Sequence, residues 1–314
     1  MSPRPEPGLV SVVIPCYNAE AYLAAAIRSA LNQTHPAIEV IVVDDGSSDG
    51  SRLVAASFGD RITLLAEPHR GGNAARNAGV ARARGEYILM LDADDVLGPT
   101  CAASRAEVLA AEPEVGLVAG HYREIDAAGA LLPRIPEVRR LGPLAPFRQA
   151  VRRNWGPPVG WVFRREAYER CGGFDPLLRS CQDWDFVIRV ALRYRIAYVP
   201  RAEAFYRKLP GSVSSDPGRM LTEMARLQRK NRAYAESGWR YRIDCALGRF
   251  ELGRRVLHAS LTGAPLATAV PRTLLLVARR PSLVWIGALS AITFVAGKRP
   301  SAKSHAPAPA SVPA

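Results

Sequence analysis

The sequence predicts an α/β protein whose sheet is mostly parallel and flanked by helices. Three observations predict it: short apolar runs rich in β-branched residues alternate with Ala-rich stretches, polar turns follow the apolar runs, and the overall composition is that of a globular protein. Of 314 residues, 48% are hydrophobic and 23% charged, which supplies enough apolar surface for a large core. Because ligands bind at the carboxyl ends of strands in such sheets, the polar turns are where functional residues are expected.

The first two strands and the helix between them form the clearest unit. Residues 9–15 (LVSVVIP) and 39–43 (EVIVV) are apolar and β-branched, and between them apolar residues recur at helical spacing from 20 to 32. A strand, a crossover helix and a second strand indicate parallel pairing. The same patterns predict strands at 62–66, 87–91, 115–119 and 159–163, and helices at 74–84, 101–111, 164–170 and 183–195.

The net positive charge lies in the last third of the chain. Residues 1–200 hold equal numbers of basic and acidic side chains, so the net charge of +13 lies in residues 201–314. The sequence predicts a basic helical extension over 216–300 and a disordered Ala/Pro-rich tail over 301–314. Residues 283–297 form an uncharged run that is shorter than the roughly 20 residues of a spanning helix.

Two interpretations of the extension remain open. It lies on an anionic membrane surface, or it packs against the rest of the protein. Nucleic acid is not expected as a partner, because interleaved aromatic residues and a recognisable binding motif are missing. The five cysteines include no CxxC pair, and the start of the sequence does not resemble a secretory signal. We therefore expect a cytoplasmic location, peripheral to the inner face of the membrane if the first interpretation holds.

Acidic clusters follow several predicted strands. Asp92, Asp94 and Asp95 come directly after the strand at 87–91, and carboxylates so close together repel one another unless a cation or hydrogen-bond donors neutralise them. The first and third residues of this turn offer two hard oxygen ligands for Mg²⁺ or Mn²⁺, with room for a substrate diphosphate. Solvated turn acids are the alternative. For Asp44 and Asp45, followed by Gly and Ser, turn and cap roles are equally plausible.

Several motifs in one order resemble the inverting glycosyltransferases of family 2, which have the GT-A fold. The resemblance covers roughly residues 8–215 and implies transfer of a sugar from a nucleoside-diphosphate donor to an acceptor hydroxyl with inversion. The segments that carry it are VSVVIPCYNAEAYLAAAIRSALNQT, IEVIVVDDGSSDGS, GGNAARNAGVARARGEYILMLDADD, GGFD and QDWDF.

The resemblance also implies roles for single residues. Pro15 and Tyr17 would line the nucleotide base site, Asp45 would accept a hydrogen bond from the base edge, and Arg76 and Asn77 would lie beside the nucleotide. Asp92 and Asp94 match the DxD motif, which holds the ribose and the metal-bound diphosphate. Asp183 matches the general base that removes the acceptor proton. Taken alone, Asp183 would equally suit a helix N-terminus, and Asp185 is expected to cap that helix or pair with Arg189.

The sequence departs from the family at two positions. Gln182 stands where a Glu is frequent, and Leu209 stands where a His would contact metal or phosphate, although Arg207 or Lys208 offers a substitute phosphate contact. These departures keep a second hypothesis open, a non-catalytic module that binds nucleotide sugars. A third is a haloacid-dehalogenase-like phosphatase with Asp92 as nucleophile.

The resemblance leaves the substrates undetermined. A surface glycan or lipid-linked acceptor is expected, and Trp155 and Trp161 are candidates for stacking on a sugar.

Overall fold

The computed structural model describes residues 4–133, 146–152, 156–178, 180–209, 217–234 and 245. Internal contacts divide the chain into the units Met1–Arg249 and Phe250–Ala314, and the second unit lies outside the described residues. So do the predicted apolar run at 283–297 and the tail at 301–314. No helix in the described ranges is long and apolar enough to cross a membrane.

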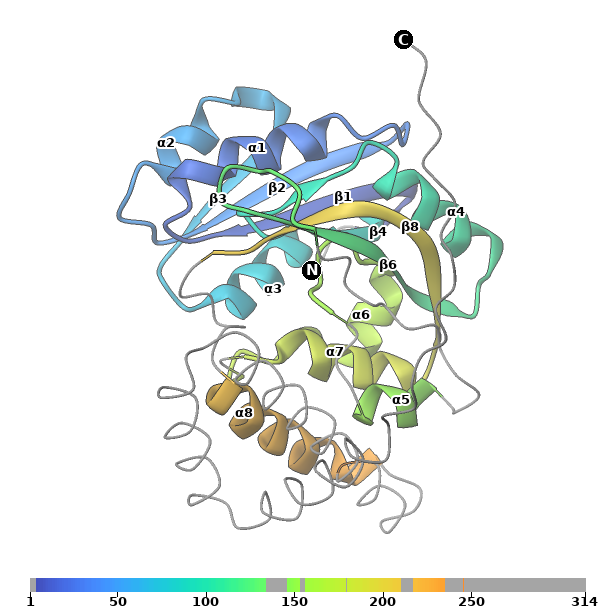
Figure 1. Cartoon of the computed structure of the whole chain (residues 1–314). Helices are drawn as coiled ribbons and strands as arrows, with labels where there is room; N and C mark the ends of the chain where they lie inside the picture. Colours follow the sequence, from blue (N-terminus) through green and yellow to red (C-terminus); the bar gives the residue numbers. More distant parts are fainter. Residues whose placement is uncertain are drawn as a thin grey trace, which may run out of the picture. The chain divides into compact units, whose positions relative to one another are not determined.

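An eight-stranded sheet forms the centre of the described structure (Figure 1). Its order is β3-β2-β1-β4-β7-β6-β8-β5, in which β7 and β5 run antiparallel to their neighbours and all other pairs are parallel. The mostly parallel sheet is therefore confirmed. The strands are β1 (Glu6–Cys16), β2 (Ile38–Asp45), β3 (Thr63–Glu67), β4 (Gly85–Met90), β5 (Val96–Leu97), β6 (Val115–Ile125), β7 (Val162–Arg164) and β8 (Arg195–Arg207).

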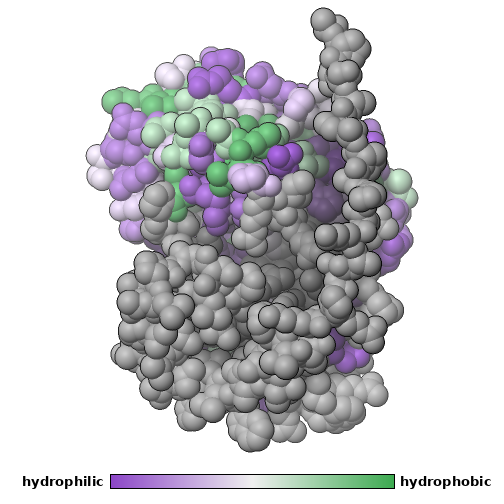
Figure 2. All heavy atoms as spheres, in the orientation of Figure 1, coloured by the Kyte–Doolittle hydropathy of each residue, from purple (hydrophilic) through white to green (hydrophobic). Residues whose placement is uncertain are grey.

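Helices cover both faces of the sheet (Figure 1). On one face lie α1 (Glu20–Leu31), α2 (Ser51–Ala56) and α4 (Cys101–Ala111); on the other lie α3 (Gly72–Arg82), α6 (Arg165–Cys171) and α7 (Gln182–Ala191). The remaining described helices are α5 (Pro146–Arg152), α8 (Pro217–Lys230) and the 3₁₀ turns η1 (Gly59–Arg61) and η3 (Asn231–Tyr234). In the same orientation, Figure 2 shows hydrophilic residues mixed with scattered hydrophobic ones on the coloured surface, as is usual for folded proteins.

Side chains alternate along β1, so this strand contributes to the hydrophobic core on both faces of the sheet. Val12 and Ile14 belong to the cluster that also buries Leu23 of α1, whereas Val13 faces α3. A Cβ at Gly79 would lie 2.4 Å from Val13 Cγ1. Glycine at this position therefore lets α3 pack closely on the sheet.

Aromatic packing holds α6 and α7 against the sheet. The rings of Phe163, Tyr168, Phe174 and Phe186 lie with centroids 4.9–6.5 Å apart. Phe163 lies on β7, Tyr168 on α6 and Phe186 on α7, while Phe174 belongs to the loop between these helices. Buried aromatic pairs contribute beyond their area, so this cluster fixes the loop as well as the helices.

Five described elements differ from the sequence prediction. The helix expected over 183–195 ends at Ala191, and β8 begins at Arg195. Pro200 lies within β8 and makes this strand hard to predict. It is accommodated where the β6–β8 register shifts, because Gly120 pairs with Val199 and His121 pairs with Ala202. The short elements α2, β5 and α5 were also not predicted.

Candidate active site

The turn after β4 places an ion pair at the carboxyl end of the central strands. Arg76 of α3 donates from Nη2 to Asp92 Oδ1 at 2.5 Å, and its Nη1 lies 3.4 Å from Asn73 Oδ1. The guanidinium is buried, and its carbon lies 5.9 Å from the centre of the Phe174 ring. The structure thus brings two predicted site residues, Arg76 and Asp92, into direct contact.

Two further carboxylates crowd the same turn. Burial, followed by the charge of Asp92, raises the pKa of Asp94 to about 6. Asp95 is fully buried; its Oδ1 accepts a hydrogen bond from the backbone N–H of Arg207 at 2.8 Å, and its Oδ2 has no hydrogen-bond partner among the described residues. Burial and the neighbouring Asp94 raise the pKa of Asp95 well above its ordinary value. The turn therefore has an excess of negative charge that a cation would relieve.

A second group of predicted residues lies at the ends of β1 and β2. Tyr17 is 49% exposed and stacks on His69, with ring centroids 4.1 Å apart. Asp45 is 2% exposed, and its two carboxylate oxygens accept the backbone N–H groups of Arg70 and Gly71 at 2.8 and 2.9 Å. His69 Nδ1 lies 3.0 Å from Asp45 Oδ2. Asp45 thus shapes the turn that carries His69, the stacking partner of Tyr17. Its predicted hydrogen bond to a base stays a prediction.

Pro15 and Asp44 flank this group. Pro15 is half-buried at the end of β1. Asp44 Oδ1 accepts the backbone N–H of Ser47 at 3.1 Å, which confirms the turn interpretation of Asp44.

Asn77 connects α3 to the loop before α7. Its Oδ1 accepts the Tyr168 hydroxyl at 2.5 Å and the backbone N–H of Phe174 at 3.1 Å, and its Nδ2 donates to the Phe174 carbonyl at 2.8 Å. With these bonds Asn77 holds the GGFD loop in place. Its predicted position beside the nucleotide stays a prediction.

Asp183 lies in the first turn of α7. The preceding Cys181 has the left-handed backbone conformation, φ 58°, which turns the chain sharply into the helix. Asp183 is 9% exposed, and one carboxylate oxygen accepts the backbone N–H of Trp184 at 2.8 Å. Asp185 pairs with Arg189 at 2.8 Å, as predicted from their spacing.

The residues present fit a divalent cation in part. Asp92 and Asp94 provide hard oxygen donors of the kind that Mg²⁺ and Mn²⁺ prefer. The described residues contain no group of three or more His, Cys, Asp or Glu side chains arranged to hold a metal ion. A cation at this turn would therefore complete its coordination with oxygens from a ligand such as a diphosphate.

At the second departure from the family, Leu209 follows Arg207 and Lys208 at the end of β8. Arg207 is buried and donates to the backbone carbonyls of Asp94, Asp126 and Ala127 at 2.7–3.0 Å, so it braces the acidic turn. Lys208 is exposed and Leu209 is half-buried.

Trp161 is 2% exposed, so its ring packs in the core and does not present a face to a sugar. Trp155 lies outside the described residues.

Two residues that contact the predicted site residues were not expected from the sequence. His69 covers the Tyr17 ring, and its signal in the sequence is an aromatic side chain two residues before Gly71 and Gly72. Phe174 lies under the Arg76 guanidinium; its motif was recognised, but its contact depends on the packing of α6 and α7. Neither contact is visible in the linear spacing.

Comparison with known proteins identifies the relatives of this chain. The family model described as "Glycosyl transferase family 2" matches residues 11–172, more than half of the chain. An uncharacterized glycosyltransferase of Nostoc sp. is 34% identical over 211 residues, which cover 63% of this chain and 64% of the relative. Glycosyltransferase GlyG of Streptococcus pneumoniae is 36% identical over 122 residues, 38% of this chain and 40% of the relative. The matched segments span less than two-thirds of these relatives.

Solved structures share the fold at low sequence identity. S. aureus TarS in complex with UDP-GlcNAc has a TM-score of 0.60 and 19% identity, covering 86% of this chain and 79% of that one. A mannosyltransferase from Pyrobaculum calidifontis in complex with GDP-Man and Mn²⁺ has a TM-score of 0.59 and 20% identity, covering 95% and 90%.

Proposed function

The chain belongs to glycosyl transferase family 2 and has its GT-A type fold, and on this premise we propose that it transfers a sugar from a nucleoside-diphosphate sugar to an acceptor hydroxyl. The observation that carries the proposal is the contact of Arg76 with both Asp92 and the ring of Phe174 in the GGFD loop. It joins the acidic turn after β4 to the loop that leads into α7, where Asp183 lies. A donor at the turn and a base on α7 would then be neighbours.

The donor site comprises two parts. The exposed Tyr17 ring, backed by His69, offers a flat surface for a nucleotide base beside Pro15 and Asp45. Asp92, paired with Arg76, and Asp94 would hold the ribose and diphosphate, and Asn77 would lie beside the nucleotide. The complexes of two fold relatives with UDP-GlcNAc and GDP-Man support a nucleoside-diphosphate sugar as donor.

A Mg²⁺ or Mn²⁺ ion would be held by Asp94 and Asp92. Burial and then the charge of Asp92 raise the pKa of Asp94, so a cation would stabilise the ionised carboxylates of this turn. The Mn²⁺ complex of a fold relative supports this metal class. When bound, the cation supplies positive charge that stabilises the leaving diphosphate.

Asp183 is proposed as the general base. Its carboxylate would take the proton of the acceptor hydroxyl while the hydroxyl oxygen forms a bond to the anomeric carbon. The bond from that carbon to the diphosphate oxygen breaks, and the electron pair leaves with the nucleoside diphosphate. Attack on the face opposite the leaving group inverts the configuration, and one base suffices for this reaction.

The acceptor is proposed to be a growing surface glycan or a lipid-linked sugar at the cytoplasmic face of a membrane. The support is the charge of the sequence, since the whole net charge of +13 lies in residues 201–314 and basic segments are attracted to anionic lipid. The phosphatase hypothesis loses support, because the family match includes Asp92 and Asp92 is bound by Arg76.

A panel of donors tests the proposed reaction. Release of nucleoside diphosphate is measured from UDP-, GDP- and dTDP-sugars with Mg²⁺ or Mn²⁺ and with EDTA, in the presence of a membrane extract as acceptor source. We expect release from one donor class that EDTA abolishes. Tight nucleotide binding without release from any donor would contradict the proposal and favour a non-catalytic binding module.

A further inference from the structure

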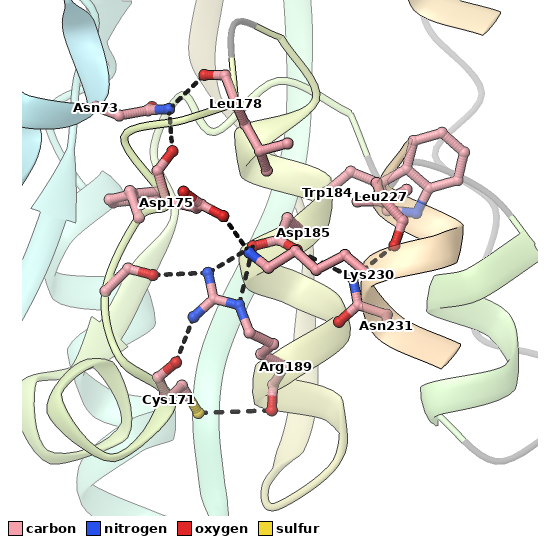
Figure 3. A network of polar contacts seen from close by, with 12 residues as sticks. Asn73, Cys171, Asp175, Leu178, Trp184, Asp185, Arg189, Leu227, Lys230 and Asn231 are labelled. Carbon is pink, nitrogen blue, oxygen red and sulfur yellow. Dashed lines mark hydrogen bonds and ion pairs between the residues drawn. The ribbon is translucent and has the colours of Figure 1, made fainter. Parts of the chain in front are cut away.

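The inner side of α7 is fixed by a buried carboxylate, Asp185 (Figure 3). Asp185 is 0% exposed, and its Oδ2 accepts Arg189 Nε at 2.9 Å and Lys230 Nζ at 3.0 Å. Its Oδ1 accepts Asn231 Nδ2 at 3.0 Å. A buried carboxylate is tolerated only when it is paired and hydrogen-bonded in this way. Two of its partners come from the end of α8 and the start of η3, more than 40 residues further along the chain.

Lys230 also reaches the loop that precedes α7. Its Nζ lies 2.6 Å from Asp175 Oδ2, so one ammonium joins Asp175 and Asp185 (Figure 3). Partial burial acts to raise the pKa of Asp175, but the hydrogen bonds from Lys230 and the backbone N–H of Leu177, together with the charges of Lys230 and Arg189, outweigh it and the pKa is lowered.

The loop is tied in turn to the donor side of the site. Asn73 Nδ2 donates to the carbonyls of Asp175 and Leu178 at 2.8 and 2.9 Å. Asn73 lies in the first turn of α3 and also contacts Arg76, the residue that binds Asp92. A continuous set of contacts therefore connects the acidic turn, α3, the GGFD loop, Lys230 and α7.

Resting on the proposed function, we propose that Lys230 and Asn231 are positioning residues that hold α7 so that Asp183 meets the acceptor hydroxyl opposite the donor. Asp183 and Asp185 are two residues apart on one helix, so their side chains point to different sides of it. Fixing Asp185 from within sets the rotation and the position of α7, and with them the direction of the Asp183 carboxylate. Both positioning residues lie beyond residue 172, where the family match ends.

Loss of Lys230 leaves the helix folded but less closely held. Arg189 and Asn231 still neutralise and hydrogen-bond Asp185, and the Lys230 side chain is 35% exposed. A displacement of about 1 Å in a catalytic group is enough to lower a rate by up to about 100-fold. The defect should thus appear in turnover and not in donor binding.

The test compares Lys230→Met with wild type, with Lys230→Arg as the conservative variant and Arg226→Met as the matched control. Arg226 lies one turn earlier on α8 and pairs with Glu223 of the same helix. We expect Lys230→Met to lower kcat about tenfold or more with the donor KM within about twofold of wild type. Lys230→Arg should recover most of the rate, Arg226→Met should match wild type, and Asn231→Ala should resemble Lys230→Met. Thermal unfolding of each variant checks that it is folded.

Combining Lys230→Met with Asp183→Asn separates a positioning role of Lys230 from a general loss of protein stability. Because Lys230 acts through Asp183, Lys230→Met should cause no further loss of the residual rate in the Asp183→Asn variant. An equal loss in both backgrounds, or a kcat for Lys230→Met within twofold of wild type, would overturn the positioning role and leave the proposed function intact. If the wild-type protein transfers no sugar, the proposed function itself fails and the positioning role falls with it.

Discussion

The acidic turn after β4 concentrates charge that single residues must balance. Arg76 neutralises Asp92, whereas Asp94 and Asp95 remain with pKa values raised by burial and by their charged neighbours. Arg207 braces the turn through backbone carbonyls and not through the carboxylates. The turn is thus held in shape by Arg76 and Arg207, whereas Asp94 has no cationic side chain bonded to its carboxylate among the described residues.

Replacing Arg76 should weaken donor binding. Arg76→Met removes the charge-assisted bond to Asp92, a bond of a kind that contributes about 1.5–3 kcal/mol, so nucleotide Kd should rise about 10- to 100-fold. Isothermal titration with the donor nucleotide and metal measures it. Arg82→Met, an exposed position at the end of the same helix, should leave Kd unchanged. Equal Kd values for both variants would contradict a donor role for Arg76.

The cysteines should be slow to alkylate in the folded protein. All five are buried, and burial raises the pKa of Cys101 to about 11 and that of Cys181 to about 12. Since the thiolate is the reactive form, a raised pKa lowers reactivity at a given pH and restores it only as the pH rises. Iodoacetamide at pH 8 followed by mass spectrometry should show little labelling of these two residues until urea is added. Rapid labelling of Cys181 in the folded protein would contradict its burial.

Part of the site follows from residue spacing and part does not. The Asp185–Arg189 pair is a helical i,i+4 contact and was predicted from the sequence. The contact of Asp185 with Lys230 and Asn231 joins positions 45 and 46 residues apart, and no local pattern encodes it. The stacking of His69 on Tyr17 likewise depends on the turn that Asp45 shapes.

At the scale of elements, α3 connects the two sides of the site. Its first turns carry Asn73 and Asn77, which both bind the GGFD loop before α7, and Arg76, which binds Asp92 of the acidic turn. Gly79 brings this helix close to β1. The position of α3 on the sheet therefore determines how the loop before α7 sits against the turn after β4.

Removing Asn77 should destabilise the protein through the GGFD loop. Asn77→Leu leaves the backbone groups of Phe174 and the Tyr168 hydroxyl without their partner, and unfolding free energy should fall by about 2–3 kcal/mol. Tyr168→Phe removes one of these bonds and should lower it by only about 1 kcal/mol. Urea unfolding followed by tryptophan fluorescence gives both values. A smaller loss for Asn77→Leu than for Tyr168→Phe would contradict the bracing role.

The elements that the sequence predicted share strong local patterns. Apolar β-branched runs located β1, β2 and β4, and helical periodicity located α1 to within a residue or two. In contrast, β8 contains Pro200 and pairs with β6 through register shifts, and α2 and β5 are too short to show periodicity. These elements are specified by pairing and packing partners that lie far away in the sequence.

At the scale of the whole molecule, the sheet unites a parallel half and a mixed half. β3, β2, β1 and β4 carry the Tyr17 group and the acidic turn at their carboxyl ends, and β7, inserted antiparallel, joins them to β6 and β8. The aromatic cluster on β7 carries α6 and α7. The predicted donor-site residues thus lie at the parallel half of the sheet, and the proposed base lies on a helix packed against the mixed half.

The basic C-terminal part should bind anionic membranes. Residues 283–297 are uncharged and are bracketed by Arg279, Arg280, Lys298 and Arg299, and each basic residue near an anionic surface contributes about 1 kcal/mol. Deleting residues 270–314 should therefore reduce sedimentation with vesicles containing phosphatidylglycerol at low salt. Vesicles of phosphatidylcholine alone provide the neutral control. Equal sedimentation of the full chain and the deletion variant would contradict this role.

The assignment of Asp183 as general base is tested most directly by Asp183→Asn. With the donor and metal established, transfer to acceptor and nucleotide Kd are measured for this variant and for wild type under the same conditions. We expect kcat to fall about 10²- to 10⁴-fold with Kd unchanged, because the amide cannot accept the hydroxyl proton but keeps the shape of the side chain. A kcat within a few-fold of wild type would exclude Asp183 as the general base.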